Sequence, residues 1–173
     1  RDTEVFNRKL RKYDSILAGE ASAKFSVLLG NVAAFDCRIS QLPTPQLVVD
    51  YFMWRQEDAH RNALNAHSYW ALRKSGVPMA QATAKLKRLA VAEKHELLFS
   101  EFGINFNDIP AWQKKGIGCY VETYAKTGTN LKTGESTTTE RKRIKVDLDL
   151  AMKEDYALFI KTLLTKEHLD LVF

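Results

Sequence analysis

The feature that most constrains the fold is one uninterrupted helical pattern in the first half of the chain. Thr44 and Pro45 are typical of an N-cap followed by the first position of a helix. From Gln46 to Ser75 the sequence then contains neither Gly nor Pro. The segment carries many large apolar residues, namely Val48, Val49, Tyr51, Phe52, Trp54, Trp70 and Leu72. The sequence therefore predicts a long central helix that is buried on more than one side.

Shorter periodic segments surround this helix. Helical spacing predicts helices over residues 5–29, 79–89, 90–102 and 153–164, and alternation predicts strands over 35–39, 117–124 and 141–150. The last two strands form a predicted β-hairpin. Residues 126–140 are rich in Gly, Thr, Lys and Ser, so we expect an exposed, mobile loop or arm there. The expected fold is a single domain over residues 1–173, of the α/β (α+β) class, with an antiparallel sheet flanked by long helices.

Composition narrows the possible functions only slightly. The 26 Lys and Arg residues exceed the 21 Asp and Glu residues, and this net charge of +5 permits nucleic-acid binding. Cys37 and Cys119 form no CxxC pair, so we expect two free thiols in the cytosol and neither zinc nor a disulfide. No window is apolar enough to span a membrane, so we expect a soluble, cytoplasmic protein. The chain does not begin with Met, and we expect its true N-terminus to be missing.

Two helical segments carry polar groups that can bind ligands. Arg8, Lys9, Arg11 and Lys12 occupy adjacent turns and can converge on a polyphosphate, although a solvated helix face has the same spacing. On the long helix a polar stripe mixes cations with amides; it consists of Arg55, Asp58, Arg61, Asn62 and Asn65. His60 and His67 share a face, but two histidines without a third ligand do not define a metal site.

Further cations occur in the helical segment predicted over residues 90–102 and in the last strand. Lys94 can reach a phosphate or pair with nearby carboxylates. Arg141, Lys142 and Arg143 open a strand, where they can neutralise an RNA backbone or protect an edge strand from aggregation. The sequence contains no GxxxxGK[ST], GxSxG or HExxH motif, and only Asp36, Asp147 and Asp149 fall in predicted strands. We therefore assign no catalytic residue and no metal ligand.

Several blocks resemble the tRNA-His guanylyltransferase family, which includes related 3′-to-5′ RNA polymerases. They are VVDYFMWRQEDAHR (48–61), NAHSYWALRKSG (65–76), EKHELLFSEFGINFN (93–107) and WQKKG (112–116), with FDCRI (35–39) upstream. They follow one another in the family's order. The resemblance covers roughly residues 6–121 and implies the C-terminal part of a polymerase-palm-like protein.

The family's chemistry follows from this resemblance. It implies nucleotide addition to the 5′ end of tRNA, with ATP and GTP as substrates and two Mg²⁺ ions held by RLDGR-like and SDE-like motifs. Neither motif is present here; both precede the first helix in family order. The resemblance also implies a homo-tetramer that binds tRNA and nucleoside triphosphates. The absence of an apolar span predicts no membrane contact.

The resemblance extends to individual residues. It implies nucleotide contacts at Arg8, Lys9 and Lys12, a nucleotide or RNA contact at Lys94, and RNA contacts at His60 and Asn62. The RNA contacts expected at Arg55, Arg61, Arg141, Lys142 and Arg143 follow from the charge and spacing of these residues. His60 and Asn62 match a His-x-Asn-Asn signature, whereas Ala63 replaces its second Asn. This departure favours relatives that repair truncated tRNA 5′ ends. Trp54, Trp70, Phe99 and Phe102 match aromatic positions that we expect in the core.

Two other functions stay open at this point. One is a non-catalytic RNA-binding or assembly module that lacks the metal-binding half. The other is a palm-fold signalling polymerase, which the absence of a GGDEF-like motif disfavours.

Overall fold

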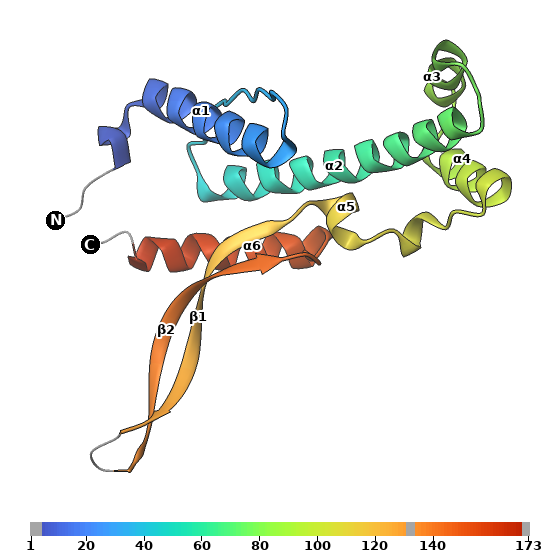
Figure 1. The fold of residues 1–173 in the computed structure, drawn as a ribbon. Coiled ribbons are helices and arrows are strands. Elements are labelled where there is room, and N and C mark those ends of the chain that lie inside the picture. Colours follow the sequence, from blue (N-terminus) through green and yellow to red (C-terminus); the bar gives the residue numbers. More distant parts are fainter. Residues whose placement is uncertain (1–4, 131–133, 171–173) are drawn as a thin grey trace. The chain divides into compact units, whose positions relative to one another are not determined.

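The computed structural model describes residues 5–130 and 134–170, without the side chains of Val5, Arg8 and residues 166–170 (Figure 1). The chain forms two compact units. One comprises Arg1–Val48 and Thr162–Phe173, and the other comprises Val49–Lys161. The single domain expected from the sequence stays a prediction.

The first unit begins with a short 3₁₀ turn, η1 (Val5–Arg8), followed by helix α1 (Leu10–Leu29). Phe6 and Asn7 have φ values of 54° and 50°, which interrupt the helix predicted over residues 5–29. Gly30 ends α1 in the left-handed conformation, with a φ of 68°.

The strand predicted over residues 35–39 is wrong. A strand needs an edge to pair with, and no described residue supplies one to this segment. Serine hydroxyls of α1 bind the backbone just before it instead. The Ala33 N–H donates to Ser26 Oγ at 2.9 Å, and the Phe35 N–H donates to Ser22 Oγ at 2.9 Å. The Phe35 ring also packs edge-on against Phe25, with centroids 5.3 Å apart.

The long helix α2 (Pro45–Lys74) starts where the sequence predicts. The Leu47 N–H donates to Thr44 Oγ1 at 3.3 Å, so Thr44 is the N-cap. Within the described residues, however, α2 buries one face rather than several, through Val49, Gln56, Leu64, Ser68, Ala71 and Leu72. Trp54 and Trp70 are more than half exposed, as is Phe99, so the prediction that these three aromatics are core residues is wrong for this chain.

The C-terminal half of α2 forms the core of the second unit. Around it lie α3 (Met79–Lys87), α4 (Val91–Glu96), the π-helical turn η2 (Leu97–Glu101) and the 3₁₀ turn η3 (Phe106–Asp108). One cluster joins Leu64 and Ala71 to Leu98 and Phe106, and a second joins Leu72 to Ala82, Leu86 and Leu97. Phe102 packs against both clusters. Gly103, with a φ of 65°, ends this helical stretch, and its position agrees with the helix predicted over residues 90–102.

The predicted hairpin is present. After the short helix α5 (Ala111–Lys115), strands β1 (Gly118–Thr129) and β2 (Ser136–Asp147) pair antiparallel, from Gly118 opposite Asp147 to Thr129 opposite Ser136. They form a long twisted ribbon, which we call the arm (Figure 1). The strands include residues 126–129 and 136–140 of the segment expected to be a loop, and the described residues there are exposed; residues 131–133 lie outside the description.

The chain then continues into helix α6 (Lys153–Asp170). Helices combined with a two-stranded antiparallel sheet confirm the predicted α+β class.

Candidate functional site

One face of the arm alternates aromatic and charged side chains. The register places Tyr120 opposite Lys145, Glu122 opposite Arg143, and Tyr124 opposite Arg141. Residues two apart in a strand share a face, so these six side chains lie together. We call this set the cationic-aromatic face.

Contacts across the strands order this face. Arg143 Nε and Nη2 each lie 2.8 Å from Glu122 Oε2, and the guanidinium carbon is 4.8 Å from the Tyr124 ring centre. Lys145 Nζ lies 3.6 Å from Glu122 Oε1 and 5.8 Å from the Tyr120 ring centre. Arg143 and Lys145 are thus each held by the Glu122 carboxylate together with an aromatic ring.

The charges on this face are stabilised at neutral pH. The hydrogen bond from Arg143 lowers the pKa of the Glu122 carboxyl, and the charges of Arg143 and Lys145 lower it further. The hydrogen bond with Tyr120 is the main cause that raises the pKa of Lys145, followed by the charges of Tyr120 and Glu122. The carboxylate and the ammonium therefore stay ionised near pH 7.

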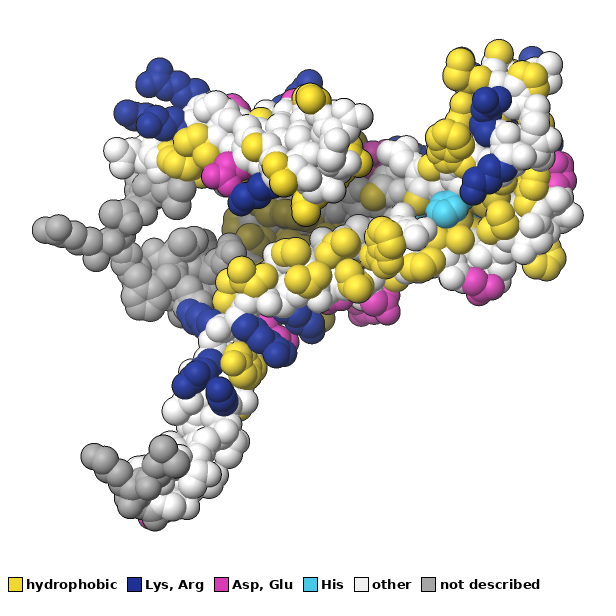
Figure 2. Space-filling view, viewed as in Figure 1, with side chains coloured by type: hydrophobic (Ala, Val, Ile, Leu, Met, Phe, Trp, Pro, Cys, Tyr) yellow, Lys and Arg dark blue, Asp and Glu magenta, His cyan; other side chains and the backbone are white. Residues whose placement is uncertain are grey.

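The opposite face of the arm differs. Val121, Ile144 and Val146 are exposed there. In the view of Figure 2, hydrophobic side chains gather over the base of the arm, and Lys and Arg side chains lie further along it. Lys142 lies on this side, across from Thr123. The predicted basic run therefore divides: Arg141 and Arg143 lie on the cationic-aromatic face, and Lys142 does not.

On α2 the structure brings three predicted residues together around Asp58. Asp58 accepts hydrogen bonds from Arg61 Nη2 at 2.5 Å and from Asn62 Nδ2 at 3.1 Å. Arg55 Nη1 is 3.9 Å from the same carboxylate, and its guanidinium lies 5.5 Å from the Trp54 ring centre. Both arginine side chains are more than half exposed, so the stripe is a pre-ordered polar surface.

His60 does not share that surface. Its imidazole packs edge-on against Phe106, as do those of His67 and His95, with ring centroids 5.5, 5.8 and 5.3 Å from the phenyl centroid. Burial lowers the pKa of His60, and the charges of Lys114, His95 and Lys115 lower it further. His60 is therefore a neutral, half-buried imidazole at pH 7.

The predicted nucleotide contacts occupy both units. Lys9 and Lys12 are exposed residues at the start of α1 in the first unit, and the side chain of Arg8 lies outside the description. Lys94, on α4 in the second unit, is half-buried, and its side chain makes no hydrogen bond or ion pair with a described residue.

Sequence reasoning missed Tyr120 and Tyr124 as candidate contacts. Their signal is visible in the sequence, since Tyr-x-Glu-x-Tyr in one predicted strand and Arg-x-Arg-x-Lys in the other share period two. That the two patterns lie on the same face of the arm follows only from the pairing register of β1 and β2, which the sequence does not reveal. Sequence reasoning also missed Gln56 and Lys115, which donate to the backbone just after the arm, and Lys114, which donates to the backbone of η3.

Two kinds of feature are absent from residues 5–130 and 134–170. These residues contain no group of three or more His, Cys, Asp and Glu side chains that could hold a metal ion. No helix among them is long and apolar enough to cross a membrane.

The fold and these surfaces define an α+β protein with a long helix that carries a polar stripe and an antiparallel arm that carries a cationic-aromatic face. Residues 46–172 match the family model described as the Thg1 C terminal domain. The chain belongs to the tRNA-His guanylyltransferase (Thg1) family.

Individual relatives agree with this assignment. The chain is 36% identical over 125 residues to a probable tRNA(His) guanylyltransferase of Drosophila melanogaster, covering 67% of this chain and 44% of the relative. A bacterial tRNA(His) guanylyltransferase (Thg1)-like protein in complex with ATP is 29% identical with a TM-score of 0.63, covering 91% of this chain and 59% of that one. A bacterial Thg1-like protein in complex with GTP is 29% identical with a TM-score of 0.60, covering 91% and 57%. The chain spans about half the length of the curated relatives it matches.

Proposed function

We propose that this chain supplies substrate-binding surfaces of an enzyme that adds nucleotides to the 5′ end of tRNA by 3′-to-5′ polymerisation, as tRNA-His guanylylation or tRNA 5′-end repair. The match of residues 46–172 to the family's C-terminal domain carries the proposal. The relatives' names supply the activity and the tRNA substrate.

The cationic-aromatic face is suited to RNA. Arg141, Arg143 and Lys145 can neutralise phosphates, while Tyr120 and Tyr124 can contact bases or riboses. Lys142 adds a cation on the other side of the same strand. We assign Arg141, Lys142 and Arg143 to RNA binding.

The stripe on α2 offers a second RNA contact. Asp58 aligns Arg55, Arg61 and Asn62, whose donors suit phosphates and base edges. His60 lies off this stripe, against Phe106. Because it is neutral at pH 7, it suits a hydrogen bond to a base better than an ion pair with a phosphate.

The nucleotide contacts proposed are Arg8, Lys9, Lys12 and Lys94, with ATP and GTP as substrates. The bacterial Thg1-like structures in complex with ATP and with GTP support this choice. Mg²⁺ is the expected cofactor, but the described residues offer no group of ligands for it, so no residue is assigned to it. The proposed assembly is a homo-tetramer, and the proposed compartment is the cytoplasm.

The test measures RNA binding and catalysis separately on the full-length protein. Arg141→Gln should weaken binding of a 5′-truncated tRNA and reduce the slope of log K against log salt by about 1 for each phosphate that is no longer neutralised. Lys85→Gln, which removes a cation paired with Glu101 on another surface, is the matched control. Equal effects of the two substitutions would contradict the RNA-binding role of the arm.

The catalytic measurement uses the same truncated tRNA with Mg²⁺, ATP and GTP, and follows lengthening of the 5′ end on a sequencing gel. Addition of nucleotides supports the enzyme. Tight, Arg141-dependent binding without any addition would contradict it and support a non-catalytic RNA-binding or assembly module.

A further inference from the structure

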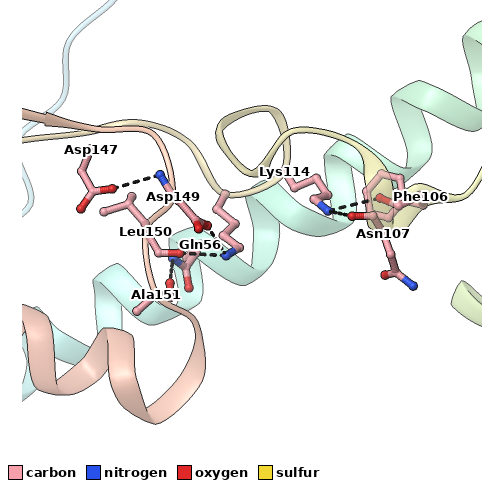
Figure 3. Close-up of polar contacts among 9 residues, drawn as sticks. Gln56, Phe106, Asn107, Lys114, Asp147, Asp149, Leu150 and Ala151 are labelled. Carbon is pink, nitrogen blue, oxygen red and sulfur yellow. Dashed lines mark hydrogen bonds and ion pairs between the residues drawn. The ribbon is translucent and has the colours of Figure 1, made fainter.

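Two side chains from different elements hold the segment that follows the arm. Gln56 Nε2, from α2, donates to the Ala151 carbonyl at 2.8 Å. Lys115 Nζ, from α5, donates to the adjacent Leu150 carbonyl at 2.9 Å and lies 3.2 Å from Asp149 Oδ1 (Figure 3). Two consecutive carbonyls thus accept hydrogen bonds, one from the Lys115 ammonium and one from the Gln56 amide. We call these two contacts the clasp.

Burial indicates which of these contacts fixes the segment. Gln56 is 5% exposed and the Lys115 side chain is 17% exposed, whereas the Asp149 side chain is 81% exposed. A buried donor that loses its acceptor has no water to replace it, so the bonds to the two carbonyls have little freedom to break. The exposed ion pair with Asp149 contributes less.

The clasp continues directly into the arm. The Asp149 N–H donates to Asp147 Oδ1 at 3.0 Å, and the Tyr120 hydroxyl donates to Asp147 Oδ2 at 3.0 Å. Asp147 is also the ladder partner of Gly118. A chain of contacts therefore runs from α2 through residues 147–151 to the base of both strands.

The neighbouring lysine fixes the other side of α5. Lys114 Nζ donates to the carbonyls of Phe106 at 3.3 Å and Asn107 at 2.7 Å (Figure 3). A five-residue helix is unstable by itself. The two lysines of the WQKKG segment thus tie α5 to η3 on one side and to the base of the arm on the other.

Small changes at the base have large effects at the tip. Each strand has 12 residues. A strand of this length spans roughly 40 Å, so a tilt of about 10° at the base moves the tip by about 7 Å. That displacement is comparable to the spacing of adjacent phosphates along one nucleic-acid strand.

We infer that Gln56 and Lys115 are positioning residues that set the direction of the arm relative to α2, and so place the cationic-aromatic face on the RNA. The functional half of this inference rests on the proposed RNA binding. The two residues do not contact the RNA themselves; they act through the carbonyls of Leu150 and Ala151.

The first experiment measures the direction of the arm without RNA. Spin labels are attached at Thr138→Cys on the arm and Ala66→Cys on α2, with Cys37→Ser and Cys119→Ser as background, and their distance distribution is recorded by pulsed electron paramagnetic resonance. Gln56→Met and Lys115→Met should each broaden the distribution at least about twofold, because each removes a donor while keeping an unbranched side chain of similar length.

Two matched variants separate positioning from general loosening. Lys115→Arg keeps a cationic donor and should restore a narrow distribution. Lys85→Met removes an ion pair between α3 and η2 and should leave the distribution unchanged. Distance distributions of equal width in the wild type, Gln56→Met and Lys115→Met would overturn the inference. It would also be overturned if Lys85→Met broadened the distribution as much as Gln56→Met and Lys115→Met do. Far-UV circular dichroism checks that each variant is folded.

The second experiment measures the consequence for RNA in the full-length protein. Gln56→Met and Lys115→Met should weaken binding of the truncated tRNA about tenfold because the arm is no longer preorganised. ATP binding should stay unchanged, and Lys115→Arg should recover the tRNA affinity. A broadened arm with unchanged tRNA affinity would overturn the functional half. A wild-type protein that binds no tRNA would contradict the proposed function instead, and the distance distributions then decide the positioning role independently.

Discussion

The two ends of the arm are built differently. At the base, the buried Leu150 packs against Gly118, and both carboxylate oxygens of Asp147 accept hydrogen bonds. In the distal part, over residues 126–129 and 136–140, every residue is exposed. A cross-strand side-chain contact there joins the hydroxyls of Thr127 and Thr138, 3.4 Å apart.

The sequence of the base is therefore constrained by folding, whereas that of the distal part is constrained much less. Burial and hydrogen bonding constrain which residues can occupy the base, because the base must hold its shape. The distal part depends mainly on the backbone ladder, which most polar residues can form. Folding therefore does not require the particular side chains of the distal part, which are mostly Thr, and they are free to contact a ligand.

The largest effect should come from a cavity at the base. Leu150→Ala removes a side chain that is 6% exposed, so the free energy of unfolding should fall by about 2–5 kcal/mol. Ile144→Ala, at a side chain that is 74% exposed, should change it by no more than about 0.5 kcal/mol. Urea unfolding measures both. If the free energy of unfolding fell by a similar amount in the two variants, the base would be no more important for stability than the exposed part of the strand.

Overpacking the base should have a smaller effect. A Cβ at Gly118 would lie 2.7 Å from Leu150 Cδ2, so Gly118→Val should cost about 1–3 kcal/mol. Gly128, in the distal part, has no atom within 4 Å of such a Cβ, and Gly128→Val should cost nothing measurable. The same urea series tests both variants. A destabilised Gly128→Val would show that the distal part is packed after all.

Between these two parts, the cationic-aromatic face predicts a pH dependence. Arg143 lowers the pKa of Glu122 below its ordinary value of 4.5. The stability that this ion pair contributes is present above pH 4.5 and disappears as the pH falls through the lowered pKa. In an NMR titration the Glu122 midpoint should lie below the ordinary value and should rise in Arg143→Gln. Lys142→Gln, on the opposite face, should leave the midpoint unchanged; a rise there would mean that general charge, not the hydrogen bond, lowers it.

The smallest effect should come from the distal hydroxyl pair. Thr127→Ala, Thr138→Ala and the double variant should show a coupling energy below about 0.5 kcal/mol, because the contact is solvated. A thermal-unfolding double-mutant cycle measures it. A coupling above about 1 kcal/mol would mean that side chains, and not the ladder alone, stabilise the distal part.

Local signals predicted much of the fold. Thr44 and Pro45 specified the start of α2, and alternation specified the parts of β1 and β2 nearest the base of the arm, because caps and period-two patterns act within a few residues. The distal parts of both strands, residues 126–129 and 136–140, were expected to be a loop because their composition is typical of turns. The strand expected over residues 35–39 failed because a strand depends on a distant partner, and none of the described residues pairs with this segment.

The candidate site was predicted less completely for the same reason. Arg55, Arg61 and Asn62 were found because they share one helix face within a few residues of Asp58. Gln56 and Lys115 were missed because their partners lie 95 and 35 residues away. Trp54 and Trp70 were expected in the core because size alone suggests burial, whereas exposure depends on what else covers the helix.

The packing of three imidazoles around Phe106 has a spectroscopic consequence. Phe106 is 2% exposed, and the rings of His60, His67 and His95 surround it edge-on. The magnetic field induced by the phenyl ring therefore displaces the carbon-bound proton resonances of these histidines from those of solvent-exposed imidazoles. Since the rings come from α2, α4 and η3, any ligand that shifts one element against another changes these resonances. The protein thus contains its own reporter for ligand binding, which needs no label and uses no residue of the arm.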